Sequence, residues 1–433
     1  MSSILFVTNV DYRYYDNNRV HHFVEHFQNW FDHVYLMYTR QYVPGRFSAV
    51  SRIVGFFTFM TKRFKSGTVD CIEVDPLLNR VGGLALSLLQ VKDPYEVPSL
   101  RVTGLLRRLL SPVGFLTELG IVPSLLIAYG LHVRKKVDIV VGQTPWEMAF
   151  GIVLTRCGLA NMVVYDDFDY APGTVPVEGM RRKLIATVEK FCLRHSDLVI
   201  SVGQLMGNLR EQQTGKNVCV IPNGVDYELF QRAQKKLAHP PTLVYTGFVY
   251  EYAGLDIIFR SLVQVRERIP AIRLLIIGHT VPEYLDALIK LRSELGLNEC
   301  IDYVGKLSYA DLVPHLQIAD IGLALSKPIP LRKYAFPLKV VEYFAAGLPV
   351  VTTRGLQGAQ VVEEARAGLA VDYSITAVTE ALIKILEDKD QYREYSQNAV
   401  LAASDYSWQE LTRRAYEVIE AHYTEKVTNR KTS

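Results

Sequence analysis

The stretch "YAFPLKVVEYFAAGLPVVTT", from Tyr334 to Thr353, places one lysine and one glutamate inside an otherwise apolar helix that leads through Gly-Leu-Pro into a valine-rich strand. An unpaired charge in a protein core costs several kcal/mol. Lys339 and Glu342 stand three residues apart, close enough to pair on one face of the helix. The two charges are therefore either a salt bridge within the helix or part of a ligand site.

Strand-like apolar runs alternate with helix-period segments on both sides of this stretch, which is typical of α/β folds with parallel sheets covered by helices on both faces. A chain of 433 residues also exceeds the usual size of a single core. We predict a first domain over residues 1–223, a linker over 224–241 that ends in two prolines, and a second domain over 242–407. A closing helix near 408–425 is expected to pack back on the first domain.

The composition, 49% hydrophobic and 21% charged, is that of a folded globular protein. The five cysteines are scattered without paired spacing, which argues against a disulfide framework or a structural zinc site and fits a reducing compartment. The first residues have no basic lead and only a short apolar run, so we interpret them as a buried strand and not a signal peptide. We expect a cytoplasmic location, and no stretch has the length of a membrane span.

Residues 45–136 hold 13 Lys and Arg against 6 Asp and Glu, although the whole chain nets only +3. Two parts of this segment mix bases with bulky apolar side chains: "RIVGFFTFMTKRFK" (52–65) and "LLRRLLSPVGFL" (105–116). Such stretches suit the headgroup layer of an anionic membrane at the inner face of the cell membrane; the alternative is a helix with a solvated basic face. Nucleic acid is not an expected partner, because no stacking aromatic residues alternate with bases on a strand-rich module.

Ligands of parallel α/β sheets bind beyond the carboxyl ends of the strands. In the second half these loops hold glycines that let a ligand approach the backbone, a carboxylate that can accept two hydrogen bonds from a diol, and cations that can hold a diphosphate. This set suits a nucleotide diphosphate, whereas the absence of GxGxxG and P-loop patterns argues against a dinucleotide or ATP. The residues are Gly247, Gly254, Val304, Gly305, Lys306, Leu307, Arg332, Lys333, Lys339 and Glu342.

Several of these segments occur in an order and spacing that resemble a known family. They are "VIPNGVDYELF" (220–230), "LVYTGFVYEYAGLDIIFRSL" (243–262), "IRLLIIG" (272–278), "IDYVGKLSYADLVPHLQIADIGLAL" (301–325) and "FPLKVVEYFAAGLPVVTT" (336–353). Together they resemble the GT-B glycosyltransferases, closest to the retaining, nucleotide-sugar-dependent group that is glycosyltransferase family four-like. The similarity is weaker in the first half, at 17–27, 163–173 and 195–209. The resemblance implies two Rossmann-like, doubly wound domains that face each other across a cleft.

The resemblance also implies roles for individual residues. Glu342 would hold the ribose hydroxyls of the donor, Val304 to Leu307 would flank its base, and Gly355 and Gly358 would line the sugar and phosphate pocket. The chain departs from the family at three positions: Tyr334 stands near the transferred sugar where a glutamate is usual, and Phe248 and Ala253 replace an arginine and a lysine on the diphosphate. Arg332, Lys333 and Lys339 are candidate replacements; the alternative is that the first two are solvated loop bases.

The acceptor side is expected to come from the first domain. In "YDDFDYAPG" (165–173), Asp166, Asp167 and Asp169 follow a buried strand, and mutual repulsion can raise the pKa of one carboxylate toward that of a working base. Related enzymes often have His-Asp here, so Asp169 is the favoured acceptor-side residue. The alternative is that these aspartates cap the following turn, and whether the reaction retains or inverts the anomeric configuration stays open.

The loop after the first strand also carries polar candidates. Asp11, Arg19 and His22 are placed to touch the acceptor or a donor phosphate; alternatively, Asn17 and Asn18 cap a helix with a solvated histidine face. His22 and His26 have helical metal spacing without a third ligand, so we expect no metal. No cofactor is expected beyond the donor substrate.

We therefore predict a metal-independent glycosyltransferase that moves a sugar from a nucleotide diphosphate donor to a hydroxyl of a lipid-linked or glycan acceptor, in bacterial cell-surface polysaccharide biosynthesis. One alternative is a sugar-nucleotide epimerase or phosphorylase on the same fold. The other is a non-catalytic subunit that binds nucleotide sugars or glycans, which the three departures favour.

Overall fold

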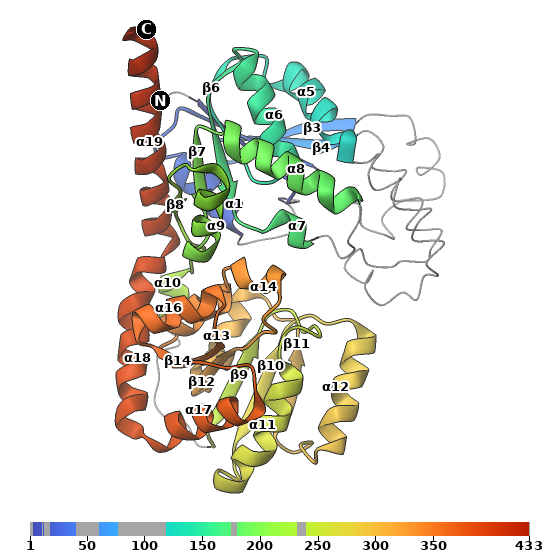
Figure 1. Cartoon of the computed structure of the whole chain (residues 1–433), viewed down its shortest axis with the longest axis vertical. Helices are drawn as coiled ribbons and strands as arrows, with labels where there is room; N and C mark the ends of the chain where they lie inside the picture. Colours follow the sequence, from blue (N-terminus) through green and yellow to red (C-terminus); the bar gives the residue numbers. More distant parts are fainter. Residues whose placement is uncertain are drawn as a thin grey trace. The chain divides into compact units, whose positions relative to one another are not determined.

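The computed structural model describes residues 3–10, 12, 18–39, 60–76, 118–174, 180–231 and 240–432. The chain divides into two compact units, one of residues 1–221 with 412–433 and one of residues 222–411 (Figure 1). The basic stretch 105–116 lies outside the described residues, and so does 52–65 except from Met60 onward. Within the described part of the chain, no helix is long and apolar enough to cross a bilayer.

Unit 1 is built on an eight-stranded sheet in the order β3-β4-β2-β1-β5-β6-β7-β8. Every pairing is parallel except the hairpin of β3 and β4 at the edge. The switch point of the topology lies between β1 and β5, where ligands of such sheets bind. The strands are β1 (Ser3–Thr8), β2 (His33–Thr39), β3 (Met60–Ser66), β4 (Val69–Asp75), β5 (Val137–Gly142), β6 (Ala160–Asp167), β7 (Leu198–Ser201) and β8 (Cys219–Val220).

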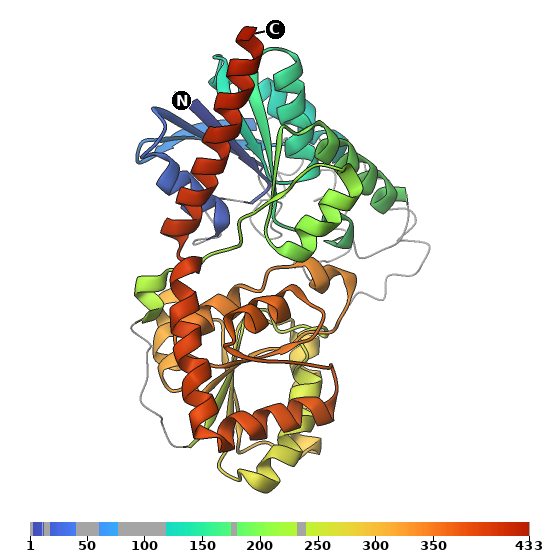
Figure 2. The same ribbon diagram turned by 60° about the vertical axis from the view of Figure 1, so that its left-hand side comes forward.

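Helices cover both faces of this sheet. Side chains of α5 (Ile121–His132), α6 (Pro145–Arg156) and α8 (Met180–His195) pack into one core with the strands. On the other face, α1 (Arg19–Phe27) sets the ring of Phe27 edge-on against Phe6 of β1 and against Tyr416 of α19 (Trp408–Thr432). Figure 2 shows α19 (red) running beside α1 (blue). The remaining helices of the unit are α7 (Ala171–Thr174) and α9 (Gln204–Thr214).

The last turns of α19 are fixed to unit 1 by polar contacts. The Tyr423 hydroxyl donates to Asp138 Oδ1 at 2.8 Å, and Lys426 forms an ion pair with Asp197. Tyr416 also stacks on Trp30, with 4.7 Å between ring centroids. These contacts explain why residues 412–433 belong to unit 1, whereas the helix begins at Trp408 in unit 2.

Unit 2 is built on a six-stranded parallel sheet in the order β11-β10-β9-β12-β13-β14. The strands are β9 (Thr242–Thr246), β10 (Arg273–Ile277), β11 (Ile301–Gly305), β12 (Ile321–Ala324), β13 (Val350–Thr353) and β14 (Gly368–Val371). The helices are α10 (Tyr227–Gln231), α11 (Leu255–Arg268), α12 (Pro282–Glu294), α13 (Tyr309–Gln317), α14 (Pro330–Tyr334), α15 (Leu338–Ala345), α16 (Gln357–Ala365), α17 (Ile375–Glu387) and α18 (Lys389–Ala403), followed by a short 3₁₀ turn, η1 (Ser404–Tyr406).

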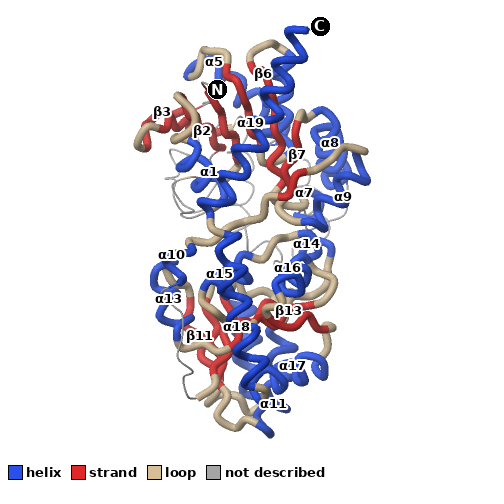
Figure 3. The backbone as a smooth tube through the Cα atoms, turned by 90° about the vertical axis from the view of Figure 1, so that its left-hand side faces the viewer, coloured by secondary structure: helices blue, strands red, loops and turns tan. Residues whose placement is uncertain are grey.

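Helix α15 is anchored to the centre of this sheet, on the face opposite α11 and α17 (Figure 3). Its Tyr343 lies against Gly322 of β12, where an added Cβ would come within 2.2 Å of the ring. The Tyr343 hydroxyl accepts a hydrogen bond of 2.8 Å from the backbone N–H of Thr246 at the carboxyl end of β9. This anchor fixes Lys339 and Glu342, on the same helix, at the end of the sheet where ligands bind.

Candidate functional site

Three neighbouring strands of unit 2 run into glycines with positive φ: Gly247 after β9, Gly278 after β10 and Gly305 at the end of β11. Gly247 N–H donates to the carbonyl of Ile277, and Gly278 N–H donates to the carbonyl of Gly305, both at 2.9 Å. A Cβ on Gly278 would lie only 1.7 Å from the Gly247 oxygen, so no side chain fits there. We call Gly247, Gly278 and Gly305 the glycine row. Gly278 packs against the Gly247 backbone, whereas a Cβ on Gly305 would meet nothing within 4 Å and one on Gly247 only the end of Lys339, so these two positions leave the backbone open to a ligand.

Lys339 lies beside this row. Its Nζ is 3.6 Å from the centroid of the Tyr245 ring and would be 3.5 Å from a Cβ on Gly247. The side chain is half-buried. Burial, with a smaller contribution from the charge of Arg332, lowers the pKa of Lys339 to about 7. An anion at the glycine row would favour the charged ammonium form.

Arg332 of α14 is a second cation near this site. Its guanidinium carbon lies 4.4 Å from the centroid of the Tyr252 ring, and its buried Nε has no hydrogen-bond partner. Among the described residues, no carboxylate forms an ion pair with Arg332 or Lys339. Lys333 is exposed and lies 5.4 Å from the ring of its neighbour Tyr334. Arg332 and Lys339 thus have aromatic partners, which attract a cation without neutralising it.

Glu342 is buried on α15 and accepts a hydrogen bond from the Tyr309 hydroxyl. Burial raises the pKa of Glu342 to about 7, and the nearby Lys339 opposes this shift. The two charges form no ion pair within the described structure, so the interpretation of this pair as a salt bridge is wrong. Tyr309 starts α13, two residues after Leu307, and so links the segment from Val304 to Leu307 to Glu342.

The other residues expected at the donor site divide into open and packed positions. Val304 is 36% exposed, Lys306 and Gly355 are also exposed, and Leu307 is half-buried. Gly254 is buried at the start of α11 with φ +75°, and a Cβ there would meet Leu325. Gly358 is buried too, and a Cβ would lie 2.8 Å from Pro337 Cγ. We therefore reinterpret Gly254 and Gly358 as packing residues, because neighbouring side chains fill the space that a ligand would need.

In unit 1, Asp166 is held in a buried ion pair. Arg19 donates to its carboxylate from Nε at 2.9 Å and from Nη2 at 2.8 Å, and Gln143 Nε2 donates at 2.8 Å. Arg19 also donates from Nη1 to the carbonyl of Ile221. Neither Asp166 nor Arg19 is therefore available in the roles expected for them, because their charges neutralise each other in the core.

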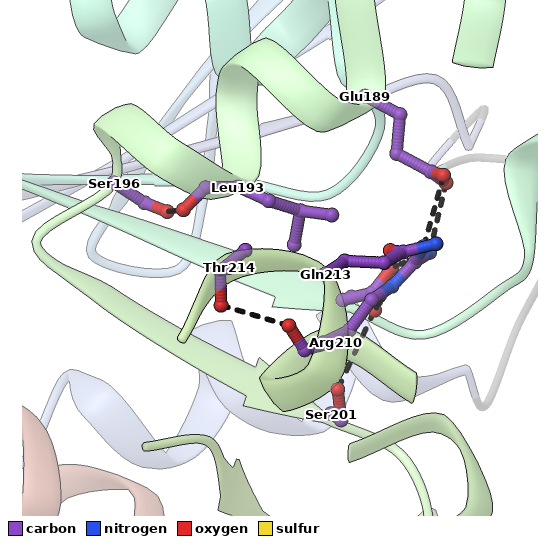
Figure 4. Close-up of polar contacts among 8 residues, drawn as sticks. Glu189, Leu193, Ser196, Ser201, Arg210, Gln213 and Thr214 are labelled. Atoms are coloured by element: carbon purple, nitrogen blue, oxygen red, sulfur yellow. Dashed lines mark hydrogen bonds and ion pairs between the residues drawn. The ribbon is translucent and has the colours of Figure 1, made fainter. Parts of the chain in front are cut away.

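Asp167 is engaged in the same way with Arg210, a fully buried side chain on α9. Arg210 donates to both carboxylate oxygens of Asp167 and to both of Glu189, and also to Gln213 (Figure 4). Burial raises the pKa of Glu189 to about 7, while Arg210 opposes this shift. We correct the expectation that Asp167 is catalytic, since Arg210 occupies its carboxylate. Asp169 is half-buried beyond the strand, and its role stays a prediction.

The loop after β1 is described only in part, and Asp11 and Asn17 lie outside the described residues. Asn18 caps α1 by accepting from the His21 N–H, as the capping alternative predicts. Burial and the neighbouring His26 and His21 lower the pKa of His22 to about 3, so a neutral His22 brings no charge to a phosphate. In the described part of the chain, no group of three or more His, Cys, Asp or Glu residues is arranged to hold a metal ion.

The sequence interpretation missed the aromatic residues that support the site. Tyr245 lies under Lys339, Tyr252 under Arg332, and Tyr309 donates to Glu342. The density of aromatic residues in "VYTGFVYEY" (244–252) is a sequence signal for Tyr245 and Tyr252, but not for Tyr309. The partner of Asp167 was also missed, because Arg210 lies 43 residues away in sequence.

Residues 226–401 match the family model described as Glycosyl transferases group 1. D-inositol 3-phosphate glycosyltransferase from Nocardia farcinica is 26% identical over 254 residues, which are 55% of this chain and 54% of that protein. The GDP-mannose-dependent alpha-(1-6)-phosphatidylinositol monomannoside mannosyltransferase of Mycobacterium tuberculosis is 26% identical over 186 residues, 40% of this chain and 47% of that protein. The chain thus spans about half the length of the curated relatives it matches.

Among solved structures, sucrose-phosphate synthase from Thermosynechococcus elongatus aligns with a TM-score of 0.71 at 16% identity, covering 98% of this chain and 100% of that one. The fold is that of the GT-B glycosyltransferases, as the sequence predicted. Residues 226–401 are thus similar to the group 1 glycosyltransferases.

Proposed function

We propose that the protein transfers a sugar from a nucleotide diphosphate donor to a hydroxyl of a lipid-linked or glycan acceptor. The observation that carries this proposal is the presence of two cations without acidic partners in the described structure, Lys339 and Arg332, close to the glycine row and to a buried carboxylate, Glu342. The diphosphate lies against the two cations, Glu342 accepts from the ribose hydroxyls, and the segment from Val304 to Leu307 flanks the base. Tyr334 lies near the transferred sugar.

In the reaction, the bond between the anomeric carbon and the diphosphate oxygen breaks and its electron pair stays on the diphosphate. Lys339 and Arg332 stabilise this growing negative charge, and such electrostatic stabilisation often contributes most to the rate of group transfer. The acceptor oxygen forms the new bond to the anomeric carbon and loses its proton to a base, for which Asp169 is the candidate. No residue in this scheme needs a metal ion.

The acceptor is proposed to be lipid-linked or a growing glycan, with the protein at the inner face of the cell membrane. The basic, apolar stretches 52–65 and 105–116 and the lipid named in the mycobacterial relative support this proposal. Met60 to Lys65 belong to strand β3, in which Arg63 pairs with Asp70. We therefore propose that residues 52–59 and 105–116 contact the membrane.

Calorimetry with UDP and GDP, followed by release of free nucleotide from UDP-glucose and GDP-mannose with a lipid extract as acceptor, tests the proposal. Glu342→Ala should weaken nucleotide binding about tenfold, as expected for the loss of hydrogen bonds to a charged group. Glu380→Ala, an exposed change on α17, is the matched control. Binding without turnover by the wild type would instead favour a non-catalytic binding subunit, the alternative suggested by Phe248, Ala253 and Tyr334. Interconversion of sugar nucleotides without acceptor would favour an epimerase.

A further inference from the structure

Helix α5 lies on the outside of unit 1 (Figure 1), and its inner face is buried in the core with the strands. A helix at a protein surface ordinarily carries polar and charged side chains on its outer face. The exposed residues of α5 are instead Pro123, Ile127, Gly130 and Leu131, and none of them is polar or charged. The outer face of this helix therefore lacks the groups that water solvates.

The exposed apolar side chains of α5 form a continuous row. Pro123, Ile127 and Leu131 follow one another at intervals of four residues, which sets them one above the other along the helix. Ile127 is 44% exposed and Leu131 is 47% exposed, and Leu119, just before the helix, is 45% exposed. We call Leu119, Pro123, Ile127 and Leu131 the apolar row. Single exposed apolar residues are ordinary, whereas adjoining ones indicate a surface that a partner covers.

Three bases follow the apolar row. Arg134, Lys135 and Lys136 connect α5 to β5, and all three are exposed. Within the described part of the chain, none of them forms an ion pair. The carboxylate of Asp70, in the edge hairpin, is already paired with Arg63, which also donates to a carbonyl at the end of α5. This end of the helix therefore keeps its positive charge.

Arg134 has an unusual backbone conformation. Its φ is +55°, in the left-handed region where the residue that ends a helix is usually glycine. A side chain at this φ strains the backbone. The negative end of the helix dipole attracts bases, but Lys135 and Lys136 provide these without such strain. The arginine is therefore kept at a cost to the fold, which points to a role for its side chain outside the fold.

We propose that α5 lies on an anionic membrane surface, with the apolar row at the upper acyl chains and Arg134, Lys135 and Lys136 at the headgroups. Burial of apolar area and attraction to anionic lipids act together at this boundary. Membrane contact is part of the proposed function, on which this inference rests, but α5 lies outside the stretches 52–59 and 105–116. A second copy of the chain fits this face less well, because a symmetric contact would bring the bases of both copies into one interface.

The test measures co-sedimentation of the full chain with lipid vesicles. One set of vesicles holds phosphatidylcholine and phosphatidylglycerol in equal parts, and the other holds phosphatidylcholine alone. Ile127→Glu removes apolar area from the row and adds a negative charge. Ile289→Glu is the matched control, because Ile289 is also 44% exposed but lies on α12 of unit 2. The melting temperature of each variant shows that it is folded, and calorimetry with UDP and GDP shows whether nucleotide binding is unchanged.

We expect the wild type to bind the mixed vesicles more tightly than those of phosphatidylcholine, and less tightly as the salt concentration rises. Ile127→Glu should lower the partition coefficient for the mixed vesicles by about tenfold or more, whereas Ile289→Glu should keep the wild-type value. Changing Lys135 and Lys136 to serine should lower it by about fivefold for each base. Arg134→Gly should also lower it by about fivefold, while its melting temperature stays the same or rises because the backbone strain is relieved.

Any of three results would overturn the inference. Wild-type vesicle binding by Ile127→Glu would assign the membrane contact to other residues. A wild type that binds the mixed vesicles no better than those of phosphatidylcholine would exclude an anionic surface as the partner. A dimer in analytical ultracentrifugation that Ile127→Glu dissociates would assign the face to a second copy. None of these contradicts the proposed transferase, which fails on a wild-type protein that neither binds nor turns over any of the nucleotide sugars.

Discussion

The buried arginines of unit 1 and two cations of unit 2, Lys339 and Arg332, have different kinds of partner. In unit 1, Arg19 and Arg210 are buried and each is neutralised by carboxylates. In unit 2, Lys339 and Arg332 lie over the rings of Tyr245 and Tyr252, and no carboxylate in the described structure pairs with them. A paired buried cation stabilises a fold only while both partners are present. A cation over an aromatic ring keeps its charge for another anion. The comparison therefore separates residues that hold the structure from residues that we propose to bind a ligand.

The largest effect is expected from removing one of the buried arginines of unit 1 that are paired with carboxylates. Arg210→Met leaves two carboxylates, Asp167 and Glu189, without their cation in the core, and should lower the free energy of unfolding by about 3–5 kcal/mol. Chemical denaturation measures the loss. The matched control is Arg63→Met, whose partly exposed pair with Asp70 should contribute under about 1 kcal/mol. Equal losses in the two variants would contradict the structural role of Arg210.

Glu147 sharpens the comparison, because it is a fully buried carboxylate of unit 1 whose oxygens have no hydrogen-bond partner in the described structure. Burial raises its pKa from the ordinary 4.5 to about 7. The unfolded chain therefore releases this proton first, and stability is lost as the pH rises from 4.5 to 7.

Glu147→Gln removes the loss of stability that comes from ionising a buried carboxyl group. We expect the variant to match the wild type near pH 4 and to be more stable at pH 8, by an amount on the order of 3 kcal/mol. Thermal and denaturant unfolding at both pH values measure the difference. A gain of the same size at pH 4 would mean that packing, and not ionisation, is responsible.

Lys339→Met tests the two cations of unit 2 that have no ion-pair partner in the described structure, Lys339 and Arg332. Loss of a charged hydrogen bond to phosphate should weaken the binding of a nucleoside diphosphate by about 1.5–3 kcal/mol, roughly 10- to 150-fold. The melting temperature should stay the same or rise, because no carboxylate loses a partner. Calorimetry and thermal unfolding give the two values, and Lys384→Met, a change at an exposed lysine of α17, serves as control. A large loss of stability with unchanged affinity would place Lys339 with the structural cations of unit 1.

Tyr309→Phe is expected to have the smallest effect. It removes one hydrogen bond to Glu342, the carboxylate proposed to bind the ribose, and should weaken nucleotide binding by about 0.5–1.5 kcal/mol. Calorimetry with a nucleoside diphosphate and with the matching free nucleoside measures the change. Because Glu342 is proposed to contact the ribose, both ligands should lose the same factor. Loss confined to the diphosphate would instead place Glu342 near the phosphates.

The periodic elements were predictable, and the edge hairpin was not. Continuous apolar runs such as Ile4 to Val7 and Val350 to Val351 indicated buried parallel strands, and the structure places β1 and β13 there. Strand β3 overlaps the stretch 52–65, which we predicted to bind a membrane because it mixes bases with bulky apolar side chains. The structure pairs it antiparallel with β4, because an edge strand can turn charged side chains outward.

The sequence by itself determined the α/β alternation, the two-domain organisation and the family resemblance, because hydrophobic period and motif spacing are local properties of the chain. It also singled out Lys339 and Glu342. Only the tertiary structure decided which charges are already neutralised, because Asp166 meets Arg19 across 147 residues of sequence and Asp167 meets Arg210 across 43. Whether a charge is paired depends on which distant element folds against it, and this pairing distinguishes the cations of the core from those that we propose to bind a ligand.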